Sequence, residues 1–332
     1  MASEEEFQEF YHKHLVPHLK ELESVRQKIS RQVVVFITLF TIFVLVSTFY
    51  LSGFNNFSLD KIERYNFIIA IVSLVAGFAI GLVIYQKIFK SRLADFRSDY
   101  KRTIIERVVK YVDDGLDYDQ DELVTEAEYR NSKIFPIDAK VYYGEDFMQG
   151  KKGKILFRFS ELHTQTYLKD HRGRKAYMTI FQGLFFVAKF KRRFKGETVI
   201  LPDTAQKLFG EFGKQIQKYN WFRDSLVEVA DQEFGKEFVV YSSDPDETKN
   251  LLTEHLAKRI LDFRNATGHR LSMSFIENCV NVAIPLNLDL FEPPLYSSML
   301  DFETIFDDYR YLSIATGIVD DLDLNADIWL QE

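Results

Sequence analysis

Two long apolar stretches, separated by a short polar loop, dominate the pattern of hydrophobic and polar positions along the chain. Residues 33–51 are nineteen residues without a charge, and residues 66–85 are twenty. A helix rises about 1.5 Å per residue, so each stretch spans roughly 30 Å, the thickness of a bilayer core. Two buried helices of a soluble domain are the alternative, but soluble cores rarely hold two such stretches in succession. The pattern therefore predicts a transmembrane helical hairpin, residues 33–85.

Basic residues beside the two stretches predict their orientation. Ten Lys and Arg flank the outer ends of the hairpin, whereas the loop between the spans holds only Lys61 and Arg64. By the positive-inside rule both termini are expected in the cytoplasm. The ten flanking residues are Lys20, Arg26, Lys28, Arg31, Lys87, Lys90, Arg92, Arg97, Lys101 and Arg102.

Small residues recur every fourth position in the second span, at Ser73, Gly77 and Gly81. Such a ladder lets helix backbones approach closely, so it predicts packing against the first span or against a second copy of the chain. The second possibility leads to the hypothesis of an oligomeric pore or transporter component. Neither span contains an ionisable side chain of the kind that usually marks an ion or proton pathway.

Apolar residues at helical spacing continue on both sides of the hairpin. They predict an N-terminal helical arm (1–32) and a helical stalk (86–114) that pair antiparallel in the cytosol. Pro17 is expected to interrupt the arm. The stripe in the stalk consists of Leu93, Phe96, Tyr100, Ile104, Val108 and Tyr111.

From Ile134 onward the periodicity changes to that of strands. Residues 155–167 and 176–190 flank a loop that contains Arg172-Gly173-Arg174, which predicts a long antiparallel hairpin. Because residues 176–190 are apolar on both faces, this strand is expected to be central. Further strands are predicted at 198–201, 226–229, 238–242, 271–276 and 279–284, and helices at 204–219, 244 to about 263, and 302–316. The cytosolic part (115–332) is therefore expected to be an α+β domain with a mostly antiparallel sheet and about three packed helices.

Charge is unevenly distributed, although the net charge is only −7. Residues 150–195 hold 13 Lys and Arg against 2 Asp and Glu, whereas residues 196–332 hold 11 against 25. Near a membrane, the basic segment is expected to bind anionic headgroups; solvated loops, or pairing with the acidic second half, is an equal alternative. Nucleic acid is not expected, because the chain as a whole is acidic. The predicted anion-binding residues are Lys151, Lys152, Arg172, Arg174, Lys175, Lys191, Arg192, Arg193 and Lys195.

Glu161 and His163 are the candidate catalytic pair, since residues two apart on a strand share a face. A satisfied polar pair where the strand leaves the core is the commoner arrangement. An adjacent nucleophile and the P-loop, HExxH and CxxC motifs are all missing. A hydrolase or transferase that uses this pair, with a metal at the carboxylates of Asp320, Asp321 and Asp323, is thus the alternative to a binding module.

An acidic segment after the stalk resembles a calcium loop in spacing. Asp117, Asp119, Asp121 and Glu128 match its ligand positions 1, 3, 5 and 12, but Glu122 replaces the glycine needed at position 6. A solvated turn followed by a short helix (125–132) with a Thr125–Glu128 capping box is the preferred interpretation. No cofactor is expected. The single cysteine, Cys279, excludes an internal disulfide and fits a reducing cytosol.

Several phrases of the chain are similar to a family of bacterial proteins known as domain of unknown function 3137. The phrases are FRFSELH (157–163), IFQGLFFVAKF (180–190), FVVYSSD (238–244), LFEPPL (290–295), LDFETIF (300–306) and IVDDLDLNADIW (318–329). The resemblance implies an inner-membrane protein with two N-terminal spans and a cytosolic domain. It assigns no activity, ligand or catalytic residue. The sequence as a whole thus predicts a membrane-anchored module that binds an unknown protein partner or the membrane surface.

Overall fold

The computed structural model describes residues 3–51, 64–169, 172–191, 193–203, 226–229, 231–286, 289–322 and 324. The chain forms two compact units. The helical unit is built from residues 2–105 and 292–304, and the sheet unit from residues 106–291 and 305–332.

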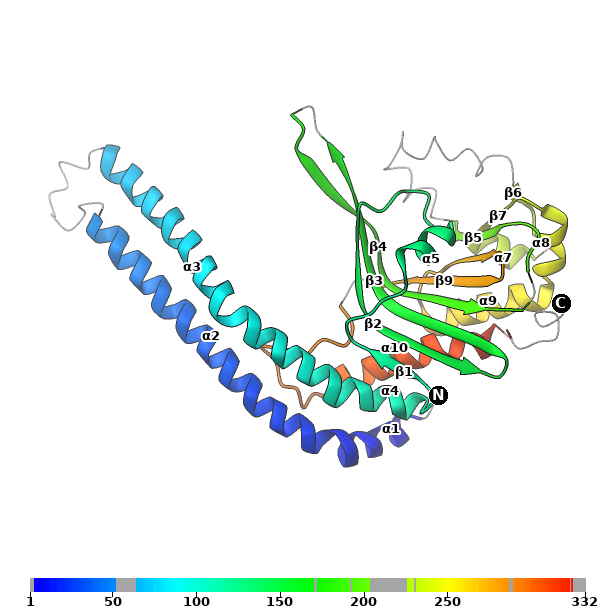
Figure 1. Cartoon of the computed structure of the whole chain (residues 1–332), viewed down its shortest axis with the longest axis horizontal. Helices are drawn as coiled ribbons and strands as arrows, with labels where there is room; N and C mark the ends of the chain where they lie inside the picture. Colours follow the sequence, from blue (N-terminus) through cyan, green and yellow to red (C-terminus); the bar gives the residue numbers. More distant parts are fainter. Residues whose placement is uncertain are drawn as a thin grey trace. The chain divides into compact units, whose positions relative to one another are not determined.

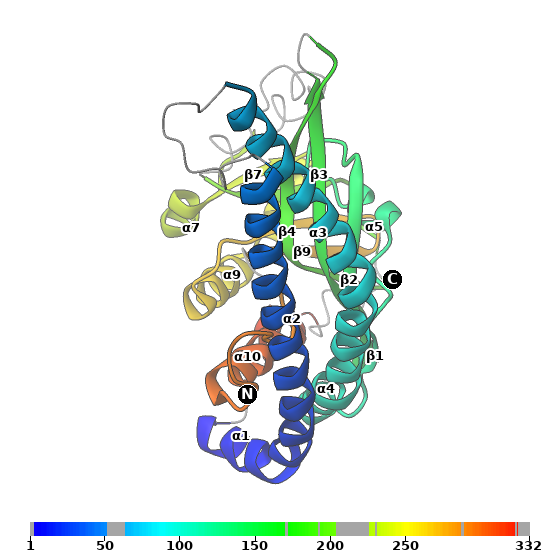
Figure 2. The same ribbon diagram turned by 90° about the vertical axis from the view of Figure 1, so that its left-hand side faces the viewer.

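Two long helical segments make up the helical unit. The first consists of α1 (Glu4–Phe10), the π-helical turn η1 (Tyr11–Leu15) and α2 (Val16–Leu51), and the second of α3 (Arg64–Tyr100) and the π-helical turn η3 (Lys101–Ile105). α2 and α3 run side by side (Figure 2), with a 2.9 Å hydrogen bond from Arg92 to Gln32. The antiparallel pairing expected between the N-terminal arm and the stalk is therefore present.

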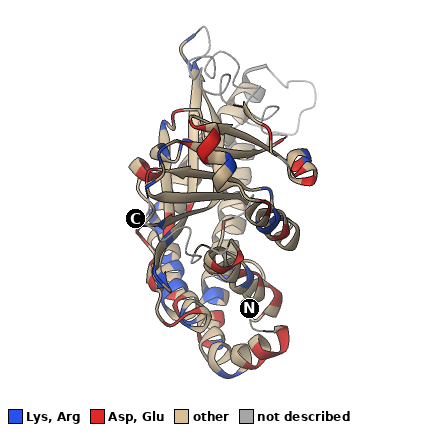
Figure 3. Ribbon diagram, turned by 90° about the vertical axis from the view of Figure 1, so that its right-hand side faces the viewer, with Lys and Arg blue, Asp and Glu red and all other residues tan. Residues whose placement is uncertain are grey.

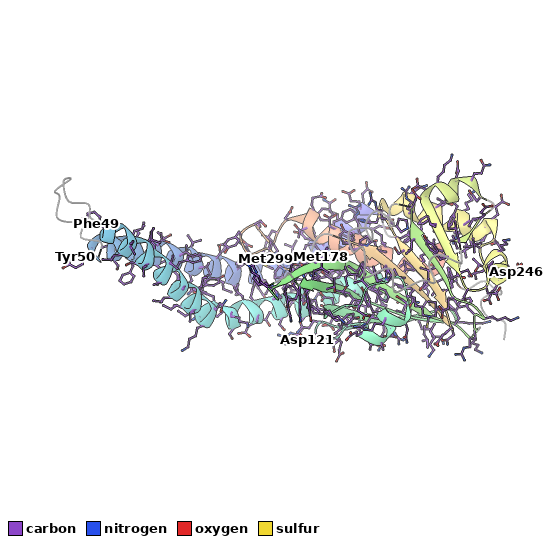
Figure 4. The ribbon with its side chains drawn as sticks, turned by 90° about the horizontal axis from the view of Figure 1, so that it is seen from above. Phe49, Tyr50, Asp121, Met178, Asp246 and Met299 are labelled. Atoms are coloured by element: carbon purple, nitrogen blue, oxygen red, sulfur yellow. The ribbon has the colours of Figure 1, made fainter. Side chains whose placement is uncertain are left out.

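α2 and α3 each include a segment long and apolar enough to cross a membrane. Their apolar side chains face outward: Phe43 and Val75 are each 65% exposed, and Phe78 is 67% exposed. Phe49 and Tyr50 likewise project outward at the end of α2 (Figure 4). The chain itself does not bury these residues, so α2 and α3 are not core helices within this chain.

In the described residues, the sheet unit contains one nine-stranded antiparallel sheet in the order β1-β2-β3-β4-β9-β8-β5-β7-β6. The long hairpin predicted from the sequence is β3 with β4, and β4 is central, between β3 and β9. The α+β class is confirmed. The strands are β1 (Asp117–Asp119), β2 (Val141–Lys152), β3 (Ile155–Lys169), β4 (Lys175–Lys189), β5 (Thr198–Pro202), β6 (Leu226–Val227), β7 (Phe238–Ser242), β8 (Ser272–Ile276) and β9 (Cys279–Pro285).

Helices lie on both sides of this sheet. Figure 2 shows α5 on one side and α9 with α10 on the other, and Arg259 of α9 donates a hydrogen bond to the carbonyl of Asp320 in α10. The helices of the sheet unit are α4 (Glu106–Val112), α5 (Glu126–Asn131), α7 (Gln232–Glu237), α8 (Pro245–Leu251), α9 (Glu254–Thr267) and α10 (Phe302–Asp321), whose first three residues belong to the helical unit.

Successive side chains of a strand point to opposite sides, and in the middle of β3 both sides are buried. Leu162 on one face packs in a cluster with Tyr129 of α5 and Phe185 of β4. On the other face the rings of Phe157 and Phe159 stack at a centroid distance of 6.5 Å. The centre of the sheet is therefore the middle layer of the core.

Two local predictions differ from the structure. Residues 244–263 form two helices, since Thr253 caps a second helix by accepting from the Leu256 N–H. Pro17 does not end the arm, because the wider π turn η1 directly precedes α2 and joins the Val16 N–H to the Tyr11 carbonyl. β1 and β2 were not predicted individually. The helix expected at 204–219 lies outside the described residues.

Gly183 allows the close pairing of β4 and β9. Its φ is +144°, and an added Cβ would overlap the Ile284 carbonyl and lie 2.6 Å from the Leu286 nitrogen. We expect Gly183→Ala to lower the free energy of unfolding by roughly 2 kcal/mol or more, which thermal melting of the detergent-solubilised chain measures. Gly235→Ala in α7 is the control, because no atom lies within 4 Å of its added Cβ. Equal melting temperatures for the two variants would contradict this role of Gly183.

Candidate functional site

The basic residues predicted to bind anions are distributed over several places. Part of the set pairs with the acidic second half of the chain: Lys152 lies 2.6 Å from Asp320, and Arg193 lies 3.8 Å from Glu277. Arg192 lies outside the described residues. The other members are Lys151 near the end of β2, Lys191 and Lys195 in an exposed segment after β4, and Arg172, Arg174 and Lys175 at the turn of the β3–β4 hairpin.

The end of the β3–β4 hairpin extends beyond the rest of the sheet (Figure 1). β3 and β4 remain paired to Lys169 and Lys175, whereas β2 follows β3 only to Gln165 and β9 follows β4 only to Gly183. We call residues 166–169 and 172–178 the hairpin tip. Among the described residues, this tip is a two-stranded ribbon with no third strand beside it.

Aromatic and basic side chains occupy the hairpin tip. The rings of Tyr167 and Tyr177 are 5.7 Å apart, and the Lys175 Nζ lies 4.3 Å from the centre of the Tyr167 ring. Tyr177 is 53% exposed and Leu168 is 38% exposed. The described residues of the tip include four cations, and the sequence places one carboxylate, Asp170, between Lys169 and Arg172. Figure 3 shows basic residues at this end of the hairpin. Aromatic rings beside long cationic side chains suit a boundary between apolar and aqueous surroundings.

Glu161 is a buried carboxyl group on β3. It is 5% exposed, and its Oε2 accepts a 2.8 Å hydrogen bond from the Leu290 N–H. Glu145 lies opposite it on β2. Burial above all, with smaller contributions from nearby carboxylates such as Asp146, raises the pKa of Glu161 to about 8. Glu161 is therefore mostly protonated at neutral pH.

His163 lies two residues further along the same face of β3. Its Nδ1 forms a short hydrogen bond with the Tyr143 hydroxyl, and its Nε2 lies 3.3 Å from the Thr179 hydroxyl. Burial lowers the pKa of His163, which favours the neutral ring. Within the described part of the chain, no hydrogen bond joins His163 to Glu161. The pair can supply a proton donor and a neutral imidazole, but the two groups do not act on each other directly.

The carboxylates near the C-terminus are not brought to Glu161. Asp320 pairs with Lys152, which is seven positions along β2 from Glu145, a separation of about 23 Å at about 3.3 Å per residue. Asp323 lies outside the described residues. An enzyme that needs both groups in one cleft is therefore not favoured by this arrangement.

The residues of the calcium-like spacing have structural partners. Asp117 and Asp119 belong to the short edge strand β1, so the expected solvated turn is partly a strand. Asp119 also accepts a 2.9 Å hydrogen bond from the Asp121 N–H. Glu128 completes the capping box of α5 with Thr125, as expected. Over the described residues, no group of three or more His, Cys, Asp or Glu is arranged to hold a metal ion.

The small-residue ladder of the second span faces the first span. An added Cβ at Gly77 would lie 2.8 Å from Val44, and one at Gly81 would overlap the Phe40 ring. Ser73, one step further along the ladder, is half-buried. The ladder thus serves packing within the hairpin, while a contact with a second copy stays a prediction.

An ion-pair cluster in the helical unit was not predicted from the sequence. Glu292 lies 2.5 Å from Arg97 and 3.1 Å from Lys101, and the Lys101 side chain is only 2% exposed. The segment 292–304 is further attached where the Glu23 carboxylate accepts a 3.1 Å hydrogen bond from the Met299 N–H. Only the fold brings together positions so distant in sequence. In the sequence, Glu292 is a single carboxylate before two prolines, and nothing beside it predicts an ion pair.

Comparison with known proteins adds a family but no activity. Residues 179–324 match the family described as "Protein of unknown function (DUF3137)", which confirms the resemblance; the phrase at 157–163 and residues 325–329 lie outside the match. No curated protein matches the chain. Among solved structures, the crystal structure of the mycobacterial trehalose monomycolate transport factor A, TtfA, is similar at 10% identity, over 62% of this chain and 91% of that one, with a TM-score of 0.29. So low a score supports no transfer of function.

We expect the buried Glu161 to make stability depend on pH. The folded chain holds its proton until about pH 8, whereas the ordinary pKa is 4.5. The contribution of Glu161 is therefore present below pH 4.5 and lost as the pH rises through about 8. Glu161→Gln should flatten the decline in melting temperature across this range.

Glu122→Gln is the matched control, because it makes the same change at an exposed carboxylate. Melting curves of the three proteins at a series of pH values test the expectation. An unchanged pH dependence in Glu161→Gln would show that another group sets it.

Proposed function

We propose that this protein, whose residues 179–324 belong to the DUF3137 family, is a two-span protein of a bacterial inner membrane that carries a cytoplasmic binding module. The observation that carries the proposal is the outward-facing apolar surface of α2 and α3. Their candidate spanning windows are only 11% and 6% buried within the chain. Water opposes the exposure of so large an apolar surface, whereas the hydrocarbon of a bilayer matches it in both chemistry and length.

The distribution of charge supports the orientation. Basic residues lie beyond the outer ends of the spans, and the stretch between them has two Lys and Arg offset by Asp60 and Glu63. Both termini are accordingly cytoplasmic, and so is the sheet unit, which follows the second span in the chain.

We expect the full chain to stay in the membrane fraction after an alkaline carbonate wash and to enter solution only with detergent. A double variant, Val75→Arg with Phe78→Arg, should insert poorly, because each arginine near a span centre costs about 2.5–3.5 kcal/mol. Immunoblots of pellet and supernatant measure the partition.

Leu226→Arg is the control, since Leu226 is an apolar residue of the sheet unit that is 62% exposed. If the double variant remains in the membrane as fully as the Leu226 variant, α3 is not needed as a span.

The module binds through the hairpin tip, and its partner is the anionic surface of the membrane. Four basic side chains and the exposed Tyr177 lie on a ribbon that contributes little to the rest of the sheet. Each well-placed Lys or Arg contributes about 1 kcal/mol at an anionic surface. Arg172, Arg174 and Lys175 are the members of the predicted set that lie on this tip.

A fluorescent label at the tip tests this binding in the full chain. The label is attached at Tyr177→Cys in a Cys279→Ser background, and the protein is placed in nanodiscs with or without anionic lipid. We expect a blue shift and quenching by brominated lipid only with anionic lipid, both weakened by salt. Replacing Lys169, Arg172, Arg174 and Lys175 by Gln should abolish the signal.

A label at Glu254→Cys on α9 is the control for non-specific quenching, because Glu254 is exposed. A tip label that behaves like the control, or a signal that persists after neutralisation, would remove the membrane surface as the partner.

A further inference from the structure

The sheet unit has a pocket at the end of β3 opposite the hairpin tip. Its volume is about 460 Å³, within the range of small-molecule sites, roughly 300–1,000 Å³. β1, β2, β3 and β4 all contribute to its walls. Its lining residues include Asp117, Gln149, Lys151, Leu156, Arg158 and Lys189.

Strand register brings three cations to one face at this pocket. Lys151 and Lys189 stand directly opposite Leu156 on its two sides, one on β2 and the other on β4. Residues opposite each other in antiparallel strands have Cβ atoms about 4.5–5.5 Å apart and share a face. Arg158, two positions from Leu156, points to the same side.

These cations have unused hydrogen-bonding capacity. The Nε of Arg158 is buried and has no hydrogen-bond partner in the described residues, while its terminal nitrogen forms an ion pair with Glu128. Lys151 and Lys189 are exposed, and in the described part of the chain neither side chain has an ion pair. An anion in the pocket would give Lys151 and Lys189 the charged partner that each lacks in the described residues. The unpaired buried N–H of Arg158 is itself a rare feature in folded proteins.

The two carboxylates of this region limit the kind of ligand. Asp117 lines the pocket and Glu128 holds Arg158, so three cations face two anions and one positive charge remains. A strongly charged, compact anion with acceptors in several directions gains most from such an arrangement. The pocket also exposes a hydrophobic side chain, since Leu156 is 56% exposed.

We propose that this pocket binds a small phosphomonoester, with the phosphate between Lys151, Arg158 and Lys189 and the organic part against Leu156. The three terminal oxygens of a phosphate dianion point in different directions and can accept from all three side chains. A carboxylate has only two oxygens, and they lie in one plane. The volume exceeds what a bare phosphate fills, which leaves room for the organic group. The site is independent of the membrane anchor and of the hairpin tip. Of its cations, only Lys151 is among the anion-binding residues predicted from the sequence.

Calorimetric titration of the detergent-solubilised full chain with phenyl phosphate tests the proposal, with inorganic phosphate as the second probe. We expect phenyl phosphate to bind more tightly than inorganic phosphate, and both to weaken with salt. Lys151→Ala with Lys189→Ala should lower the affinity by about tenfold or more. Because both lysines are exposed, the variant is expected to fold, and its melting temperature checks this.

Lys249→Ala with Lys258→Ala removes the same charge from exposed positions on α8 and α9 and should leave the affinity unchanged. A third arm adds vesicles with phosphatidic acid, whose headgroup is also a phosphomonoester. Competition with phenyl phosphate would assign a lipid source, and its absence a soluble one. No binding of phenyl phosphate, or equal losses in the two double variants, would overturn the proposal.

Discussion

The pairing of β3 with β4 is the constraint on which the sheet unit depends. Each strand is 15 residues long, and their register runs from Leu156 opposite Lys189 to Lys169 opposite Lys175. Strand alternation then decides which residues enter the core, so that Leu162 and Phe159 pack on opposite faces. A slip by one residue would exchange the two faces and expose the core. Gly183 then allows the next pairing, because its missing side chain lets β9 approach β4 closely.

The same register places each chemically interesting group. In the middle of the hairpin it buries Glu161, a carboxyl group that keeps its proton to about pH 8. At one end it extends Tyr177 and the basic turn beyond the neighbouring strands. At the other end it gathers Lys151, Arg158 and Lys189 around a pocket. The buried carboxyl group of Glu161 thus lies in the core, where it affects stability. The accessible basic side chains lie at the two ends of the hairpin.

The helical unit follows a different physical rule. In the two spans the packed seam is narrow, with Gly77 and Gly81 against Val44 and Phe40, and many of the remaining side chains are apolar and exposed. Close backbone contact through small residues holds helices together where the solvent is itself apolar. Beyond the spans, ion pairs replace apolar contacts: Glu292 forms ion pairs with Arg97 and with the buried Lys101. The change from apolar to ionic contacts along one helix pair fits the passage from a bilayer to its aqueous boundary.

Local pattern was enough to identify much of this protein. Uninterrupted apolar length identified α2 and α3, period-two alternation identified the β3–β4 hairpin, and the Thr125–Glu128 spacing identified the cap of α5. These features depend on residues near one another in the chain, so they can be read directly from the sequence. The continuous helix through Pro17 and the break before Thr253 were missed. They depend on a π turn before Pro17 and on a cap at Thr253, and the spacing of apolar residues shows neither.

Which charged residues pair with each other was decided by tertiary structure alone. Lys152 and Arg193 meet carboxylates of the second half, and Glu292 meets Lys101, across separations that no short pattern covers. The pocket likewise needs four strands in register before its three cations become neighbours. The sequence by itself determined the membrane-length helices, the α+β class and the overall segregation of charge. Only the fold decided which charged residues become neighbours, because that depends on distances between residues far apart in the chain.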